Sequence, residues 1–549
     1  MGSLPQPHDD LLTTLTLEEK ISLLAGQNFW ETVPIPRAGV PSLKVSDGPN
    51  GARGATFSNG TTAACFPASV LLAASWDLTL VRRIGNALAE ETKTKGARVI
   101  LGPTVCPHRH VLGGRNFESF SEDPLLAGVM AASYVKGVQE KGVGATVKHF
   151  AVNEQETKRF TMNANVSDRA LREIYLKPFE IAVKEAQPWA IMSSYNLVNG
   201  THADMNEYLL KTVLRENWGF DGLVMSDWGG VNSTVESLKA GLDLEMPGPT
   251  IRRKIEDVKA AINAGKLSVD VIDQRVSAVL TLLQRTGRFE NPEVEEEQAI
   301  DRPEHRAAIR EAGGKGITLL KNEDNILPLK SGHLGKVAVL GLSKTALAHG
   351  GGSASVNAHY KITPWEALQS AIGDRAELLY AEGARVDRCF PHLSSGLTTE
   401  KGEPGLTVSQ WKPDTPRSAA PDATITTPVI AYTPLETKLS FVTLTGFYTP
   451  EHSGKHHLQL GSLGPTKLFI EGELVHEITE DCDDAMGMLL GGLAGKTVEY
   501  DFIAGKKYAI RIESAAPKPE SADFVIMESL LSVTLGVMTD ATLKEDVLS

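Results

Sequence analysis

The chain has 549 residues, a hydrophobic content of 42%, a charged content of 22% and a formal net charge of −13 at pH 7. These values are ordinary for a globular protein of about two to four domains. An acidic chain without clustered basic residues has little to neutralise phosphates, which argues against nucleic acid or an anionic membrane as a partner.

The amino-terminal stretch MGSLPQPHDDLLTTL lacks a basic segment followed by an apolar one, so it does not predict a secretory signal. No apolar run in the sequence is long enough to span a bilayer. The cysteines are widely scattered and show no CxxC spacing; they are Cys65, Cys106, Cys389 and Cys482. We therefore expect free thiols in a reducing cytosol, no metal site and a cytoplasmic location.

From about Leu11 to Arg288, short apolar runs alternate with amphipathic stretches of helical period. The expected strands are Leu43–Val45, Ser69–Ala74, Ala97–Leu101, Gly144–Val147, Ala190–Ser193, Gly222–Met225 and Gly241–Glu245. The expected helices include Leu78–Lys95, Leu125–Glu140 and Ser167–Glu185. Roughly seven or eight strand–helix units in about 250 residues favour an α/β fold with a TIM-like (β/α) barrel. No GxGxxG opens a helix after a strand, so a dinucleotide site is not expected.

Polar residues follow several of these expected strands. They are Asp47, then Arg115 and Glu118, Lys148 and His149, Tyr195 and Asn196, Asp227 and Trp228, and finally Glu245 and Met246. In a barrel the carboxyl ends of all strands lie on one face, so these side chains should share one pocket.

The stretch Gly222–Gly230, GLVMSDWGG, carries the clearest signal in the chain. Asp227 follows an apolar strand, and Trp228 beside it offers a flat surface for the apolar face of a sugar ring. On this stretch alone, Asp227 could equally well cap the following helix. The other polar residues at strand ends favour a catalytic pocket instead.

The second half of the chain has a different character. Asn291–Glu304 is acidic and contains prolines, as linkers do, and a second α/β segment follows, with an expected buried strand at Val337–Leu340. The glycine-rich loop His349–Val356 lacks the Lys-Ser/Thr ending of a P-loop, so phosphate binding is not expected. After about Cys389, alternating runs separated by turns predict an all-β module of about 150 residues. Its expected strands include Lys438–Phe447, His456–Leu460, Thr466–Ile470, Thr497–Phe502 and Tyr508–Ile512.

Motifs along nearly the whole chain resemble those of glycoside hydrolase family 3. They are SDGPNGARG, GGRNFESFSEDP, VKHFAVNEQET, IMSSYNLVNG, GFDGLVMSDWGG, GITLLKNEDNILPL and HGGGSASVNAHY. The stretch TGFYTPEHSGKHHLQLGSLGPTKLFIEGELV is similar to the PA14 module inserted in fungal and yeast β-glucosidases of that family. The resemblance implies a TIM-like barrel at 1–300, the start of an α/β sandwich domain at 301–390, a PA14-like module at 391–537 and re-entry into the sandwich domain at 538–549.

The resemblance also implies roles for individual residues. The Asp of the family's SDW motif, here Asp227, is the nucleophile of a retaining glycosidase. The sugar-binding residues of the family map onto Asp47, Arg115, Lys148, His149, Met192, Tyr195 and Trp228. The implied activity is a β-glucosidase that releases terminal β-D-glucosyl residues from small or oligosaccharide β-glucosides, without a metal or organic cofactor.

One part of the family's machinery has no counterpart in the sequence. Retention needs a second carboxylic acid about 5–5.5 Å from the nucleophile. In the β-glucosidases this Glu follows the PA14 insertion, and no segment here matches its motif, so we expect the chain to stop before it and activity to be impaired. The His-Asp pair that one branch of the family uses is also missing after His149, where Glu154 and Glu156 lie without a family precedent for the role. The chain could be a fragment, a handicapped protein, or one in which another carboxylate has taken over.

Two other functions stay open on the sequence. The first is a carbohydrate-binding protein without turnover, which release from an aryl β-glucoside would distinguish. The second is a Schiff-base aldolase with Lys148 as the amine and Asp227 as the proton-transfer group. A half-built second sheet would also leave strands such as Lys336–Leu340 without neighbours, so we expect a homo-oligomer, a partner that completes the sheet, or poor solubility.

Overall fold

The computed structural model describes residues 9–56, 60–329, 332, 334–344, 350–383, 389–434, 437–489, 494–518 and 530–539. It divides into two compact units, one made of Met1–Pro328 with Leu347–Ile362 and the other of Leu329–Ala346 with Thr363–Ser549. Most of the predicted re-entry segment 538–549, and His349 of the glycine-rich loop, lie outside the described residues. The four predicted domain boundaries stay predictions. Within the described ranges, no helix is long and apolar enough to cross a membrane.

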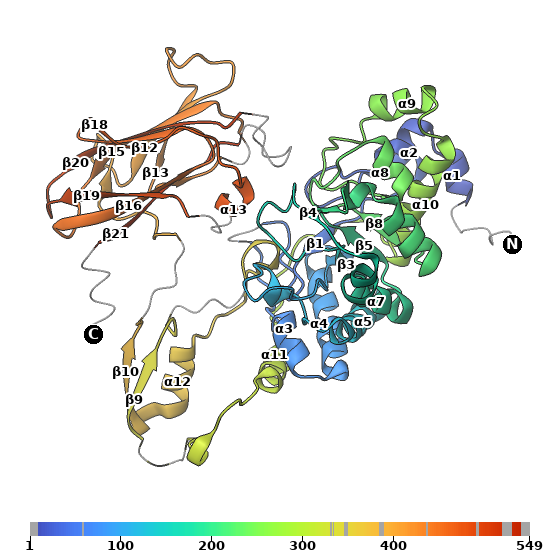
Figure 1. Ribbon diagram of the computed structural model, residues 1–549, viewed down its shortest axis with the longest axis horizontal. Coiled ribbons are helices and arrows are strands. Elements are labelled where there is room, and N and C mark those ends of the chain that lie inside the picture. Colours follow the sequence, from blue (N-terminus) through green and yellow to red (C-terminus); the bar gives the residue numbers. More distant parts are fainter. Residues whose placement is uncertain are drawn as a thin grey trace. The chain divides into compact units, whose positions relative to one another are not determined.

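The first unit is built on a parallel sheet (Figure 1). Its strands, in spatial order, are β1 (Val45–Asp47), β2 (Val99–Leu101), β3 (Gly144–Phe150), β5 (Ala190–Ser193) and β8 (Leu223–Met225). Single bridges continue the pairing: Met225 with Leu244 and Glu245 with Ala25 in parallel, then Gly26 with Thr32 and Glu31 with Lys44 antiparallel. This pairing returns to the residue before β1, so the sheet closes into a barrel in which the stretch at Glu31–Thr32 runs against its neighbours. The predicted α/β class is confirmed.

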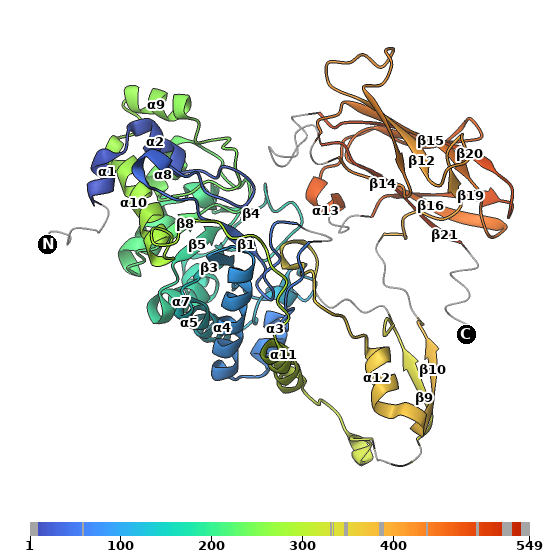
Figure 2. The same cartoon turned by 180° about the vertical axis from the view of Figure 1, so that it is seen from behind.

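Helices cover the outside of this barrel. They are α1 (Asp9–Thr14), α2 (Leu17–Leu23), α3 (Ser69–Ala74), α4 (Leu78–Thr94), α5 (Pro124–Glu140), α6 (Asp168–Ala170), α7 (Lys177–Ala186), α8 (Val235–Ala240), α9 (Ile255–Asn263), α10 (Val269–Arg285) and α11 (Pro303–Gly316). A small three-stranded sheet joins β4 (Asn163–Ala164), β6 (Leu197–Val198) and β7 (Thr201–His202). The helices α4, α5 and α7 lie side by side on one flank (Figure 2). Asp77 fixes the start of α4, because its Oδ1 accepts a hydrogen bond from the Leu80 amide at 2.9 Å.

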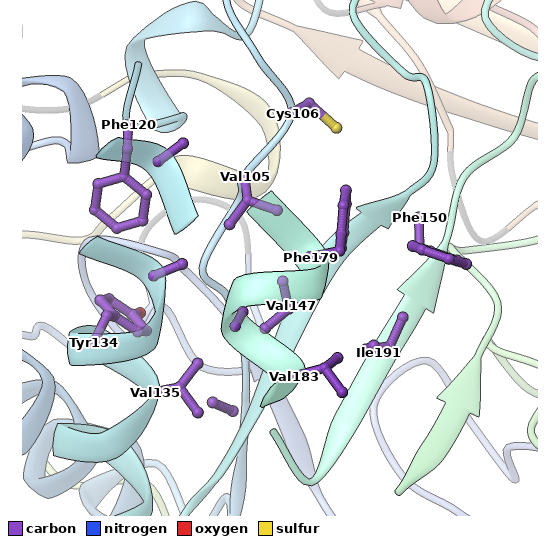
Figure 3. Close-up of a cluster of buried hydrophobic side chains, with 14 of the residues drawn as sticks. Val105, Cys106, Phe120, Tyr134, Val135, Val147, Phe150, Phe179, Val183 and Ile191 are labelled. Atoms are coloured by element: carbon purple, nitrogen blue, oxygen red, sulfur yellow. The ribbon is translucent and has the colours of Figure 1, made fainter. Parts of the chain in front are cut away.

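The barrel strands are short and apolar because both of their faces are covered. All seven residues of β3 are buried, including Lys148 and His149. Between β3, β5 and the flanking helices, Val147 and Ile191 pack among Tyr134, Val135 and Phe179 (Figure 3). This packing surrounds β3, which matters because two predicted site residues stand near its carboxyl end.

Three predictions for the first unit were wrong in detail. Gly241–Glu245, expected as a strand, makes only single bridges at Leu244 and Glu245. Ser69–Ala74 is the helix α3 rather than a strand, and its buried residues Ser69, Leu72 and Ala73 have helical spacing. The single helix expected at Ser167–Glu185 is divided by a π-helical turn at Leu171–Tyr175 before α7 begins. Pro178, in the first turn of α7, cannot donate a backbone hydrogen bond to the preceding turn, so a regular α-helix cannot pass through it.

The second unit begins with β9 (Gly335–Leu340) and β10 (Ala376–Ala381), a parallel pair connected through α12 (Pro364–Ile372). The strand predicted at Val337–Leu340 lies within β9, but its predicted burial was wrong, since Val339 is buried whereas Leu340 is 71% exposed. In the part of the chain that the structure describes, each of these two strands pairs with the other alone and one helix connects them, which is too little to cover both faces.

The rest of the second unit, where an all-β module was predicted, consists mainly of antiparallel strands. One sheet has the order β13 (Ala423–Thr427), β12 (Leu406–Trp411), β15 (Phe441–Tyr448), β20 (Tyr508–Ala515), β17 (Thr466–Ile470) and β18 (Glu473–Ile478), with β11 (Leu397–Thr398) paired to β15. The other has β14 (Ala431–Tyr432), β21 (Val533–Thr539), β16 (Gly454–Ser462) and β19 (Lys496–Phe502). Residues of both sheets, such as Leu444 and Leu458, share one apolar core. A short helix, α13 (Ala485–Leu489), comes between β18 and β19 in the chain. The assignment of this module to PA14 stays a prediction.

Candidate active site

The carboxyl ends of the barrel strands place two carboxylates beside the end of β3. Asp47 ends β1, and Asp227 stands two residues after β8. The Oδ1 atom of Asp47 lies 3.7 Å from the Lys148 Nζ, and the Oδ2 atom of Asp227 lies 3.5 Å from the His149 Nε2. Adjacent residues of β3 thus reach the two carboxylates separately.

The turn after β8 fixes the Asp227 carboxylate. Its Oδ1 accepts a hydrogen bond from the Trp228 amide at 2.7 Å, and its carbonyl accepts one from the Gly230 amide at 2.9 Å. The alternative that Asp227 caps the next helix is wrong, because α8 begins at Val235 and Thr234 occupies its N-cap position. The Asp227 carboxylate therefore does not serve as a helix cap.

Tyr195, two residues after β5, lies against the same turn. Its hydroxyl donates to the Trp228 carbonyl at 3.0 Å. Burial, and then the negative charge of Asp227, raise the pKa of Tyr195 well above its ordinary value, so this phenol stays protonated and can donate.

His149 is a neutral imidazole. Burial, and then the positive charges of Arg115, Lys148 and Arg159, hold its pKa well below the ordinary value. Its contact with Asp227 is therefore between a neutral ring and a carboxylate, not an ion pair. An uncharged imidazole here is suited to hydrogen bonding with a sugar hydroxyl.

The guanidinium groups of Arg115 and Arg159 supply positive charge near Asp227. Burial alone would lower the pKa of Arg115, but the charges of Glu118, Glu156 and Asp227 outweigh it and raise the pKa. Arg115 is ion-paired with Glu118, and its Nη2 donates to the Ser353 Oγ at 3.1 Å.

The sequence reasoning missed two arginines of this pocket. Arg53 is fully buried, and its Nη2 donates to the Asp47 Oδ2 at 2.9 Å. Arg159 pairs with Glu156 at 2.7 Å and lies 4.9 Å from the centre of the Tyr195 ring. Arg53 stands six residues after Asp47 in SDGPNGARG, a spacing that could have drawn attention to it. Nothing local in the sequence marks Arg159.

An aromatic cluster borders the pocket. The ring of Trp228 lies 5.5 Å from that of Trp30 and 6.3 Å from that of Phe29, and its Nε1 donates to the Phe29 carbonyl at 3.0 Å. Phe29 is 40% exposed, so part of the cluster faces solvent. Met192, which the resemblance assigns to sugar binding, is 1% exposed and packs with Met225 in the apolar interior.

A polar cavity adjoins these residues. It is lined by Thr104, Cys106, Pro107, Arg115, Asn116, Ser119, His149, Asn153, Glu154 and Glu156. The Thr104 Oγ1, both amide atoms of Asn153 and the Glu154 Oε1 are buried there without a hydrogen-bond partner. Burial raises the pKa of Glu154 to about 8, so its carboxyl is protonated near neutral pH. Among the described residues, no group of His, Cys, Asp and Glu could hold a metal ion.

Comparisons with known families agree with this arrangement. The model of the glycosyl hydrolase family 3 N terminal domain matches residues 25–282, and that of the glycosyl hydrolase family 3 C-terminal domain matches residues 317–531. Together these two matches cover most of both compact units.

Similar individual proteins agree with these family matches. The chain is 53% identical to Beta-glucosidase B of Emericella nidulans over 549 residues, which cover 99% of this chain and 65% of that protein. It is 42% identical to a Beta-glucosidase of Rhizobium radiobacter over 520 residues, 93% of this chain and 62% of that one. A crystal structure of Beta-glucosidase from Kluyveromyces marxianus in complex with glucose is similar with a TM-score of 0.78 and 35% identity, covering 98% of this chain and 65% of that one. The chain thus spans slightly less than two thirds of the length of these relatives, and it belongs to glycosyl hydrolase family 3.

Proposed function

We propose that this protein acts as a retaining β-glucosidase with Asp227 as its nucleophile. The observation that carries the proposal is the position of the Asp227 carboxylate, beside the neutral His149, the protonated Tyr195 and the charge of Arg115. The relatives named Beta-glucosidase, one of them in complex with glucose, support the choice of substrate.

The reaction has two steps. The Asp227 carboxylate attacks the anomeric carbon, the bond to the leaving oxygen breaks, and the leaving oxygen takes a proton from solvent. Water then attacks the covalent glycosyl-enzyme and gives its proton to solvent, releasing glucose and the free Asp227 carboxylate. Of the carboxyls lining the polar cavity, Glu156 is paired with Arg159, whereas Glu154 is protonated near neutral pH.

Asp47, Lys148 and Arg53 are proposed to hold the sugar. The Asp47 carboxylate accepts hydrogen bonds from sugar hydroxyls, and Lys148 and Arg53 can donate to the same or neighbouring hydroxyls. A site of charged hydrogen-bonding groups strongly rejects sugars that lack the matching hydroxyl, because its groups are then left unpaired. The Trp228 indole offers an apolar face to the ring.

Release of an aryl group from an aryl β-glucoside tests this proposal. Its burst and its steady-state rate are measured for the parent chain and for Asp227→Ala. Release that vanishes in the variant supports the proposal, and a burst that stalls would assign the slow step to deglycosylation. Equal release from both proteins would contradict it.

The second candidate is a glucose-binding protein without turnover. It is favoured by the charged hydrogen-bonding groups Asp47, Arg53 and Lys148, which can bind sugar hydroxyls without a reaction. Glucose binding without aryl release from the parent chain would select it. The aldolase alternative is disfavoured, since the Lys148 ammonium lies beside the Asp47 carboxylate rather than in the apolar or cationic surroundings of a Schiff-base lysine.

A further inference from the structure

A segment from beyond the barrel sequence folds back onto the pocket. We name Gly350–Tyr360 the return segment; it belongs to the first compact unit, although β9 precedes it in the chain. Its Gly352 carbonyl accepts from the Arg53 Nη1 at 3.1 Å, and its Ser353 Oγ accepts from the Arg115 Nη2 at 3.1 Å. The return segment thus contacts Arg53, which pairs with Asp47, and Arg115, whose charge acts on Asp227.

The far end of the return segment is anchored on the barrel. The Asn357 carbonyl accepts from the Ala63 amide at 2.8 Å, and the His359 amide donates to the Ala63 carbonyl at 3.1 Å. The His359 Nδ1 lies 2.9 Å from the Thr62 Oγ1, and its Nε2 lies 4.0 Å from the Glu91 Oε2. The segment therefore depends on the conformation of the stretch at Thr62–Ala64.

Glu91 holds that stretch and α11 together. Its carboxylate, on α4, is fully buried. The Oε2 accepts from the Ala64 amide at 3.1 Å, while the Oε1 lies 2.7 Å from the His305 Nδ1 and 3.5 Å from the Arg302 Nη1. No step of the proposed reaction uses this buried charge, so its several partners require another explanation.

We propose that Glu91 is a positioning residue for the sugar pocket. It ties α11, the stretch at Thr62–Ala64 and the return segment to the barrel, and the segment in turn fixes the directions of Arg53 and Arg115. The inference rests on the proposed function, because the two arginines matter only if the pocket binds a sugar. Displacement of a positioning group by about 1 Å is enough to weaken recognition strongly.

The test uses Glu91→Gln, which keeps the shape of the side chain and removes its charge. KM and kcat for an aryl β-glucoside and the Kd for glucose are measured. We expect KM and Kd to rise about fivefold to tenfold, with a smaller change in kcat, because the interactions lost are made with bound sugar and transition state alike. Glu140→Gln is the matched control, since Glu140 is an exposed carboxylate on α5 that is also ion-paired, with Arg82, and should leave all three constants unchanged.

A second measurement separates positioning from a general loss of stability. In the Ser353→Ala background the contact from the return segment to Arg115 is already lost and only the contact of the Gly352 carbonyl with Arg53 remains, so Glu91→Gln should raise KM and Kd by a smaller factor than in the parent. An effect of undiminished size in that background would overturn the proposal, and so would constants within twofold of the parent for Glu91→Gln alone. If Glu91→Gln does not fold, His359→Gln takes its place with the same two criteria. A parent chain that neither releases the aryl group nor binds glucose would overturn the proposed function itself.

Discussion

The Nε2 atom of His149 lies 3.5 Å from the Oδ2 atom of Asp227. The imidazole is neutral, because burial and then the charges of Arg115, Lys148 and Arg159 hold its pKa well below the ordinary value. The Asp227 carboxylate therefore meets a neutral hydrogen-bonding ring on one side, while its negative charge is balanced by guanidinium groups at longer range.

This relationship predicts that His149 does not titrate between about pH 5 and 8, the range in which an ordinary histidine changes charge. Its ring signals, assigned by difference from a His149→Gln spectrum, should keep constant chemical shifts over this range. His149→Gln should lower kcat/KM, since a hydrogen bond to the sugar is lost, but leave the acid limb of the pH–rate profile where it is. A shift of that limb in the variant would contradict the neutral assignment.

Asp47→Asn should weaken sugar binding. The substitution removes the charge that faces both Arg53 and Lys148, leaving two buried cations without their partner. A hydrogen bond to a charged group is worth about 1.5–3 kcal/mol, so the Kd for glucose should rise roughly 10- to 100-fold. The discrimination between glucose and its deoxy analogues should fall in parallel. Binding calorimetry with both sugars measures the two effects, and unchanged discrimination would mean that Asp47 does not touch the sugar.

The carboxyl of Glu154 should make the stability of the fold depend on pH. Burial raises its pKa to about 8 from an ordinary value of 4.5. A carboxyl with a raised folded-state pKa stabilises the fold fully below the ordinary value, and this contribution is lost as the pH rises towards 8. Glu154→Gln removes this titration, so the difference in Tm between variant and parent should move in favour of the variant from about pH 5 to pH 8. Thermal unfolding across this range is the measurement; a pH-independent difference would contradict the burial of an unpaired carboxyl.

Much of the barrel could be predicted from the sequence because its strands are buried on both faces and read as short apolar runs. Ala190–Ser193 was predicted with the bounds that β5 has, and Gly222–Met225 contains β8. Once the strand ends are known, the juxtaposition of Asp47, Lys148 and Asp227 follows from parallel topology alone.

The features of the fold and the site that could not be predicted depend on contacts between distant parts of the chain. A six-residue apolar run such as Ser69–Ala74 has the same composition as a short strand, and only its packing makes it a helix. The return segment reaches the pocket through Ser353, which lies 238 residues after the Arg115 that it contacts. No local pattern encodes such a contact. The exposure of Leu340 likewise reflects how many strands cover β9 rather than its own sequence.

The most direct test of the account is to trap the covalent intermediate. A 2-deoxy-2-fluoro-β-glucoside with an activated leaving group slows both steps, and a good leaving group needs little help from an acid, so the glycosyl-enzyme should accumulate. Peptide mass spectrometry should then find the fluoroglucosyl group on the peptide that contains Asp227, and Asp227→Ala should remain unlabelled. Labelling of another carboxylate, or equal labelling of the variant, would contradict the assignment of Asp227 as nucleophile.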